Sequence, residues 1–298
     1  MSKIQNSPIE QIKFKNINFL LKRDDLLDDD FSGNKARKFY YFLKNNFPKI
    51  KTIISHGSNQ SNAMYSLSVL AKLKNWNFKY FVNHIPSFLR NDPNGNYKYA
   101  LQNGMDIIEH EEFDKSTLDI KEDELFISEG GAINEAKYGI KILADEINTY
   151  IKENHLKNIK VFLPSGTGTT AVFLAKYLDV EVLTCACVGS DEYLIEQFKE
   201  LETNIKLHPT ILPKEKKFHF GKLYKSSYDT WLDLNKQTNI EFDLLYDPIA
   251  WQTLFYNKEE IDLNKILYIH QGGLIGNITM IKRYERKYNN HKILFNKF

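Results

Sequence analysis

The sequence is poor in cysteine, in net charge and in long apolar runs, and each shortage excludes a class of protein. Its two cysteines, Cys185 and Cys187, stand inside the apolar run 182–188. Residues two apart share one face of a strand, so this pair needs no disulfide, redox or metal role. The 40 basic and 38 acidic residues give a formal net charge of +2 and are scattered along the chain, which argues against a nucleic-acid-binding patch.

The lack of long apolar runs and of paired cysteines also indicates where in the cell the protein is expected. Residues 1–8 are polar and lack the apolar core of a signal peptide, and no stretch approaches the roughly 20 apolar residues that cross a bilayer. A reducing environment also fits two unpaired cysteines. We therefore expect a cytoplasmic protein that binds neither nucleic acid nor membrane and holds no metal.

What the sequence has in plenty is alternation of strands and helices. Residues 52–73 and 159–178 share one order: a short apolar strand, a polar loop with glycine, and an amphipathic helix. Such alternation is typical of parallel sheets with helices on both faces, in which ligands bind beyond the carboxyl ends of the strands. The 298 residues, 42% of them hydrophobic, suffice for two α/β lobes. Further strands are expected at 79–82, 105–108, 181–188 and 266–270, and helices at 97–102, 140–151 and 193–201.

The loop from Ser165 to Thr170 favours a phosphate. It offers successive backbone N–H groups and hydroxyls at the start of a helix, where unpaired amides and the helix dipole attract an anion. No Gly-Lys-Ser/Thr follows and the GxGxxG spacing is absent, which excludes the nucleoside-triphosphate and dinucleotide loops. The alternative is a glycine-rich helix start without a ligand.

The loop from residue 57 to residue 62 favours a carboxylate, because a row of neutral hydrogen-bond donors precedes the helix. Ordinary N-capping would explain one or two of these donors, but not five. The donors are Ser58, Asn59, Gln60, Ser61 and Asn62.

Lys35 lies in a Gly-Asn-Lys turn that precedes an amphipathic stretch. On its own it would be interpreted as a solvated lysine at a helix start.

Five segments, in order and over nearly the whole chain, resemble the 1-aminocyclopropane-1-carboxylate deaminase and D-cysteine desulfhydrase family. They are LKRDDLLDDDFSGNKARKF at 21–39, SHGSNQSNA at 55–63, EGGAINEAKYGI at 129–140, PSGTGTT at 164–170 and HQGGLIG at 270–276.

This resemblance implies an α/β fold like the tryptophan synthase β-subunit, which is fold type II of the enzymes that use pyridoxal 5′-phosphate (PLP). It implies two doubly wound lobes with mainly parallel sheets and the cofactor in the cleft between them. The small lobe would hold residues 47–140, and the large PLP-binding lobe residues 1–46 and 141–298. A homodimer and a small amino acid as substrate are also implied.

The resemblance assigns roles to single residues. Lys35 would hold PLP as a Schiff base, Asn62 would hydrogen-bond the 3′-oxygen of the pyridine ring, and Ser61 would face the substrate as nucleophile or proton relay. Ser58, Asn59 and Gln60 would bind the substrate carboxylate. The cofactor phosphate would be bound by Gly166, Thr167, Gly168, Thr169 and Thr170.

The reaction expected from the resemblance releases ammonia and a 2-oxo acid, because PLP is an electron sink that stabilises a carbanion. Ala250, followed by Trp251, stands where the family has a tyrosine that assists ring opening. D-Cysteine is therefore favoured over 1-aminocyclopropane-1-carboxylate, with Trp251 expected at the substrate and Tyr246 as a conceivable replacement for the tyrosine. Gln271 replaces a threonine near the pyridine nitrogen, where a neutral partner suits elimination. Ala63 replaces a histidine that commonly follows the Ser-Asn pair.

Two other functions stay open. A homologue of the same fold that binds PLP or an amino acid but has lost turnover would explain the departures from the family pattern. A binder of another phosphate ligand through residues 165–170 would leave the Lys35 segment unexplained. Residues 220–229 either shape the cleft or form a plain surface turn.

Overall fold

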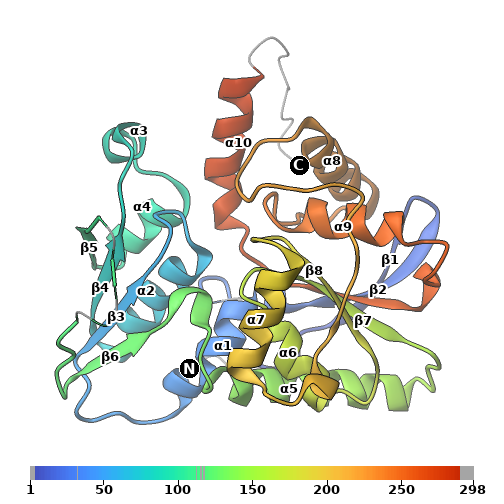
Figure 1. The fold of residues 1–298 in the computed structure, drawn as a ribbon, viewed down its shortest axis with the longest axis horizontal. Helices are drawn as coiled ribbons and strands as arrows, with labels where there is room; N and C mark the ends of the chain where they lie inside the picture. The colour runs from blue at the N-terminus through green and yellow to red at the C-terminus, as the bar shows by residue number, and fades with distance from the viewer. Residues whose placement is uncertain (1–3, 32, 112, 115, 117, 289–298) are drawn as a thin grey trace.

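The chain folds into two α/β lobes that enclose a pocket between them. The computed structural model describes residues 4–31, 33–111, 113–114, 116 and 118–288. In Figure 1 the smaller lobe lies at the left and the larger at the right, with the helices α1 (Gly33–Lys44) and α10 (Ile275–Lys287) between them. Within these residues, no helix is both long and apolar enough to cross a bilayer.

The smaller lobe is built on a sheet of four parallel strands. Its order is β5 (Met105–Glu109), β4 (Asn77–Val82), β3 (Thr52–His56) and β6 (Glu124–Ile127). The helices α1, α2 (Asn62–Lys74) and α4 (Gly95–Gln102) contribute to one hydrophobic cluster with this sheet, and the short α3 (Ser87–Asn91) adds Leu89 to it. The lobe boundaries at residues 47 and 140 stay a prediction.

The larger lobe is built on six strands. Their order is β1 (Ile9–Phe14), β2 (Ile17–Arg23), β10 (Ile266–His270), β7 (Lys160–Ser165), β8 (Val182–Ala186) and β9 (Thr210–Ile211). The β1–β2 hairpin is antiparallel, whereas β2, β10, β7, β8 and β9 pair in parallel.

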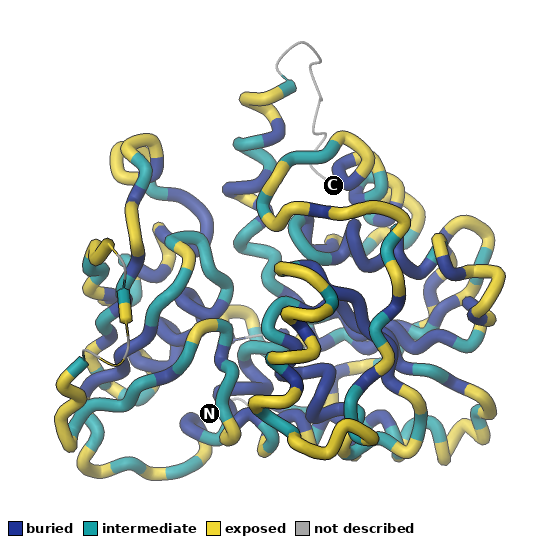
Figure 2. The backbone as a smooth tube through the Cα atoms, viewed as in Figure 1, coloured by how far each residue is buried: buried dark blue, intermediate teal, exposed yellow. Residues whose placement is uncertain are grey.

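Helices bury both faces of the larger sheet. Leu267 and Ile269 of β10 belong to a cluster with α5 (Ala136–Glu153), α6 (Thr169–Tyr177) and α7 (Asp191–Leu201). The alternate residues Ile266 and Tyr268 belong to a cluster with α8 (Lys225–Thr238), α9 (Asp247–Tyr256) and α10. Figure 2 shows the strands of this sheet as mostly buried tube under exposed helix surfaces. The doubly wound arrangement predicted from the alternating pattern is confirmed.

A buried ionic network ties α1 to α5 and to the N-terminal segment. The guanidinium of Arg37 donates to both carboxylate oxygens of Asp24 at 2.8 and 3.1 Å, and to both of Glu146 at 2.8 Å each. Lys22 Nζ donates to Glu146 Oε2 and to the Ser7 carbonyl, both at 2.6 Å. The two helices approach closely at Gly139, where a β-carbon would lie 2.0 Å from the Arg37 carbonyl oxygen.

The carboxyl ends of several strands from both sheets meet at the pocket. The segments that follow β3, β6, β7 and β10 all contribute lining residues, as does the start of α1. This is the edge of a parallel sheet at which ligands are expected. Short 3₁₀ turns complete the fold at Asp24–Leu26, Glu129–Gly131, Ile205–Leu207 and Leu263–Lys265.

Candidate active site

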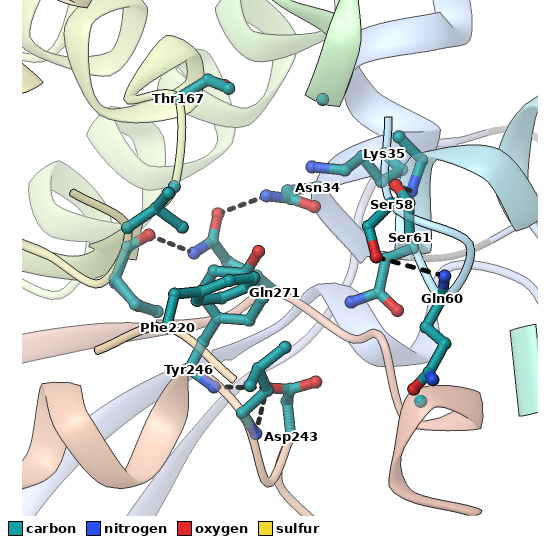
Figure 3. A pocket seen from close by; sticks show the side chains of 18 of the residues that line it. Asn34, Lys35, Ser58, Gln60, Ser61, Thr167, Phe220, Asp243, Tyr246 and Gln271 are labelled. Atoms are coloured by element: carbon teal, nitrogen blue, oxygen red, sulfur yellow. Dashed lines mark hydrogen bonds between the residues drawn. The ribbon is translucent and has the colours of Figure 1, made fainter. Parts of the chain in front are cut away.

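One cavity of about 620 Å³ between the lobes collects most of the residues that the sequence singles out. Its size lies within the usual range of small-molecule sites. Figure 3 shows side chains from both lobes converging on it. The predicted residues that line it are Lys35, Ser58, Gln60, Ser61, Asn62, Gly166, Thr167, Gly168, Thr169, Thr170 and Gln271.

The start of α1 is fixed against the end of β10. Gly33 has a φ of +66°, and a β-carbon there would lie 2.0 Å from the Gln271 carbonyl oxygen, so a larger residue would be excluded. The Asn34 N–H donates to the same carbonyl at 3.0 Å. This close approach directs Lys35 from the first turn of α1 into the pocket (Figure 3).

Lys35 and Lys38, one helical turn apart, both line the pocket. Burial lowers the pKa of the Lys35 amine to about 8, although Lys38, Glu129 and Asp243 act in the opposite direction. Burial, and after it the charge of Lys35, lower the pKa of Lys38 well below its ordinary value. Desolvation is a condition that turns a lysine into a nucleophile near neutral pH.

The turn at Glu129–Gly131 brings the smaller lobe against the rest of the site. Gly130 and Gly131 have φ values of +66° and +72°, and β-carbons on them would lie 2.9 Å from Thr167 and 2.8 Å from Phe39. Lys38 Nζ donates to the Gly130 carbonyl at 2.9 Å. Glu129 itself is exposed and adds a carboxylate to the pocket wall.

The loop at 165–170 leads directly into α6, as the sequence predicts. Ser165 is occupied within the sheet by a 2.7 Å hydrogen bond with Thr184, and Thr167 Oγ1 lies 3.1 Å from Thr169 Oγ1. The buried Thr170 hydroxyl has no hydrogen-bond partner among the described residues. An unpartnered buried hydroxyl beside the free amides of a helix N-terminus suits a phosphate oxygen, so this loop fits the cofactor's phosphate.

The loop at 57–62 divides its donors between structure and pocket. Ser61 is the N-cap of α2, and its Oγ accepts from the Ala63 and Met64 N–H groups at 3.1 and 3.4 Å. Asn59 donates to the His84 carbonyl at 2.7 Å and does not line the cavity, so the structure does not place this predicted carboxylate ligand in the pocket. Ser58 and Gln60 remain as pocket donors.

Asn62 stands between two polar partners. Its Oδ1 accepts from Asn96 Nδ2 at 2.6 Å, and its amide hydrogen-bonds the buried Asp243. The amide nitrogen carries two hydrogens, so one remains for a ligand oxygen. Burial raises the pKa of Asp243 to about 6, even though the Leu245 and Tyr246 N–H groups donate to its Oδ1 at 2.8 and 2.6 Å.

Gln271 is held at both ends of its amide. Its Oε1 accepts from Asn34 Nδ2 and its Nε2 donates to the Pro164 carbonyl, each at 2.7 Å. The side chain therefore joins the start of α1, the end of β7 and the end of β10 (Figure 3). The second Nε2 hydrogen is left for a ligand.

Trp251 lies elsewhere than predicted. It is fully buried, packs edge-to-face on Phe14 and Phe19, and stacks on Tyr268 with ring centres 4.6 Å apart. Neither Trp251 nor the buried Ala250 lines the cavity, so a substrate-binding role for Trp251 is not supported. The pattern misleads because most of α9 is buried, so its apolar residues do not indicate which face of the helix meets the pocket.

Tyr246, just before α9, does line the pocket. Its ring packs against Phe220 with centres 5.3 Å apart, and its hydroxyl lies 3.5 Å from where a Gly166 β-carbon would stand. Phe220 and Gly221 also line the cavity, while Tyr224 and Tyr228 pack on the large-lobe core. The segment 220–229 thus shapes the cleft at one end and the core at the other.

Sequence reasoning missed five charged pocket residues: Lys38, Glu129, Asp243, Asp247 and Arg283. Lys38 could have been found, because a residue three positions after Lys35 shares its helix face. Asp243 and Arg283 reach the pocket only through the packing of α9 and α10, and no local pattern marks them.

The sequence matches no protein-family model and no curated protein significantly. Among solved structures, the chain is similar to an ACC deaminase homologue at 20% identity with a TM-score of 0.76, over 97% of this chain and 95% of that one. It is also similar to a hydrogen sulfide-producing enzyme from Fusobacterium nucleatum at 12% identity with a TM-score of 0.62, over 91% and 97% of the two chains. A threonine deaminase isoform from Solanum lycopersicum matches at 13% identity with a TM-score of 0.62, over 96% and 84%.

These likenesses extend over almost the whole chain and concern the fold. They confirm the predicted resemblance and the predicted fold class, that of the tryptophan synthase β-like, fold type II enzymes.

Proposed function

We propose that the protein is a PLP-dependent lyase or deaminase that releases ammonia and a 2-oxo acid from a small amino acid. One observation carries the proposal: a single cavity holds an amine with a pKa of about 8, on Lys35, together with the unpartnered buried hydroxyl of Thr170 at a helix N-terminus. An amine and a phosphate-type loop in one pocket are the two attachments that PLP requires. The fold shared with deaminases and a hydrogen sulfide-producing enzyme supports the same chemistry.

The residues that would hold PLP are those with unused donors. Lys35 would bind it covalently, Gly166 to Thr170 would bind its phosphate, and Asn62 and Gln271 would offer one free amide hydrogen each to the ring. When bound, PLP supplies an electron sink that stabilises negative charge at the α-carbon of the substrate.

Lys35 would also move the proton at the α-carbon. Because burial lowers its pKa to about 8, an unprotonated fraction exists near neutral pH, which an ordinary lysine lacks. A neutral amine can accept the proton and return it as an ammonium group. Lys38, held on the Gly130 carbonyl, adds a second buried amine beside it.

Ser61 can serve as a proton relay while it caps α2. Two backbone N–H groups donate to its Oγ, and the Ser61 hydroxyl is also hydrogen-bonded to the Tyr80 hydroxyl, so a relayed proton would pass between Ser61 and Tyr80. The N-terminus of α2 also stabilises negative charge on this oxygen when the proton leaves. The capping and catalytic interpretations of Ser61 are thus compatible.

Tyr246 supports elimination of a β-substituent. Burial, and after it the charge of Asp243, raise the pKa of its hydroxyl, which therefore stays protonated and can donate a proton to a leaving group. We propose D-cysteine as a better substrate than 1-aminocyclopropane-1-carboxylate, with pyruvate, sulfide and ammonia as products. The homodimer and the cytoplasmic location stay predictions.

The test begins with the cofactor. Protein supplied with PLP should turn yellow, and borohydride should fix the cofactor on Lys35, where peptide mass analysis locates it. Lys35→Ala should abolish the adduct, while Lys44→Ala, at the exposed end of the same helix, should leave it unchanged. A colourless protein without an adduct would refute the proposal.

Turnover is tested next with D-cysteine. Sulfide and pyruvate should form together with ammonia, and Tyr246→Phe should lower kcat by roughly 100-fold, the usual contribution of a general acid. Bound PLP without any 2-oxo acid from a panel of small amino acids would favour a homologue that has lost turnover.

A further inference from the structure

Arg283 is a pocket residue that the proposed reaction leaves unused. It lies on α10 and lines the cavity together with Gly276 and Met280 of the same helix. Its Nη2 donates to the Gly221 carbonyl at 2.7 Å, and its Nη1 lies 3.3 Å from Met280 Sδ. The guanidinium therefore folds back along the helix toward the interior of the pocket.

No carboxylate of the described residues neutralises this arginine. Two of the other arginines, Arg23 and Arg37, are largely buried and bind carboxylates, and Arg90 binds Glu109 at the surface. Arg286 is exposed and stacks on Phe88. Arg283 alone among the five is partly buried with no acidic partner in the described structure.

Such an arrangement costs free energy unless a ligand compensates it. Burial lowers the pKa of Arg283; Tyr284 partly offsets this effect, and the charge of Arg286 lowers the pKa further. A charged group taken from water is normally paired. Two hydrogen bonds to a carbonyl and a thioether leave the remaining N–H donors of the guanidinium for another acceptor.

The position of Arg283 defines which part of a ligand it would meet. Gly276, near the Asn62 amide, stands at the inner end of α10, and Arg283 follows two turns later, a rise of roughly 10 Å along the axis. Ser58 and Gln60, the candidate carboxylate ligands, belong to the other lobe. Arg283 thus lies about two turns of α10 from Gly276 and the predicted cofactor ligand Asn62, with its guanidinium at the Gly221 carbonyl.

We propose that Arg283 binds an oxyanion, a carboxylate or a phosphate, at the far end of the substrate's side chain. The substrate class is then a β-substituted amino acid with a second negative charge. This inference rests on the proposed function and narrows it. D-Cysteine would be turned over less efficiently than a longer acidic substrate.

The test compares two probes that differ in one charge. S-Carboxymethylcysteine and S-carbamoylmethylcysteine have the same shape, but the second carries a neutral amide. Calorimetry with both enantiomers should show that the wild-type protein, as purified and after PLP loading, binds the charged probe about 10- to 100-fold more tightly, the range expected for a charge-assisted pair. O-Phosphoserine against serine gives the corresponding ratio for a phosphate.

Three variants of α10 distinguish specific recognition by Arg283 from a general effect of positive charge. Arg283→Gln should bring the ratio close to one, and Arg283→Lys should keep part of it. Arg286→Gln, which removes the same charge one turn away outside the cavity, should leave the ratio unchanged. Unfolding midpoints of the variants show whether loss of the Gly221 contact alone is responsible.

Several results would overturn the inference: a wild-type ratio near one for both pairs of probes, failure of all probes to bind, a ratio that survives in Arg283→Gln, or an equal loss in Arg286→Gln. Each leaves the proposed function standing if PLP binds and a 2-oxo acid forms. Failure to take up PLP overturns the proposed function instead, and the calorimetric ratio on the protein as purified still reports on Arg283.

Discussion

The buried network around Arg37 should be the part of the fold most sensitive to a single charge-removing substitution. Arg37 is fully buried, and its partners Asp24 and Glu146 are 1% and 10% exposed. Arg37→Met keeps an unbranched apolar stem but removes the guanidinium and leaves two carboxylates without their main partner. Removing one member of a buried ion pair typically costs about 3–5 kcal/mol, and we expect that loss in the free energy of unfolding.

Urea unfolding followed by circular dichroism measures the loss. With a slope near 3 kcal/mol per molar urea, the midpoint should fall by roughly 1 M or more. The matched control is Lys141→Met on the same helix as Glu146, where the pair with Asp145 is 55% and 57% exposed. An exposed pair of this kind contributes below about 0.5 kcal/mol. Equal effects of the two substitutions would refute the reasoning.

The same network determines whether the stability of the folded state rises or falls with pH. Burial alone would raise the pKa of Glu146, but the hydrogen bonds and charges of Arg37 and Lys22 outweigh it and lower the pKa. A carboxyl whose pKa is lower in the folded state contributes stability above its unfolded value near 4.5, and this is lost as the pH falls further. The difference between wild type and Glu146→Gln should therefore shrink in acid. A constant difference from pH 7 to pH 3 would contradict the assignment.

Three further predictions concern the site and its support. The rate of covalent capture of PLP by cofactor-free protein should rise with pH and level off above about pH 8, because Lys35 reacts as the free amine. Stopped-flow absorbance measures this rate, and a rate that keeps rising to pH 10 would contradict the lowered pKa. Gly139→Ala should destabilise the protein by about 1–3 kcal/mol, since a β-carbon would meet the Arg37 carbonyl at 2.0 Å, and a thermal midpoint equal to that of Lys141→Ala would argue against this contact. Trp251→Ala should lower the free energy of unfolding by about 3–5 kcal/mol, while the KM of the folded variant stays unchanged. A raised KM without destabilisation would instead support a substrate-binding role for Trp251.

The sheets could be predicted because their strands carry local signals. Short apolar runs that end in polar glycine loops mark β3 and β7, and the structure places both where the pattern indicates. The hairpin of β1 and β2 was not predicted, although the exposed Lys13 and Asn18 alternate with the buried Ile12, Phe14 and Phe19 as in a half-buried strand. Lys22 is buried there only because Glu146, far along the chain, compensates its charge.

The site was predictable as far as its residues lie in loops beside strand ends. Lys35, Ser61, Asn62 and the loop at 165–170 fall into one pocket because parallel strands bring their carboxyl ends together. Trp251 could not be placed this way, since its position depends on how α9 rotates against the core. Arg283 depends in the same way on the packing of α10.

The place of β10 in the larger sheet has a consequence for synthesis on the ribosome. β2 ends at Arg23 and its parallel neighbour β10 begins at Ile266, so more than 240 residues separate two paired strands. At 5–20 residues per second, the N-terminal hairpin waits between roughly 10 and 50 s for its partner. Gly33 and Asn34 rest on Gln271, just after β10, so the lysine of the pocket reaches its final position only when the last strand docks. A nascent chain stalled before residue 266 would hold both polar loops yet lack a finished site, and the pocket would be among the last features to form.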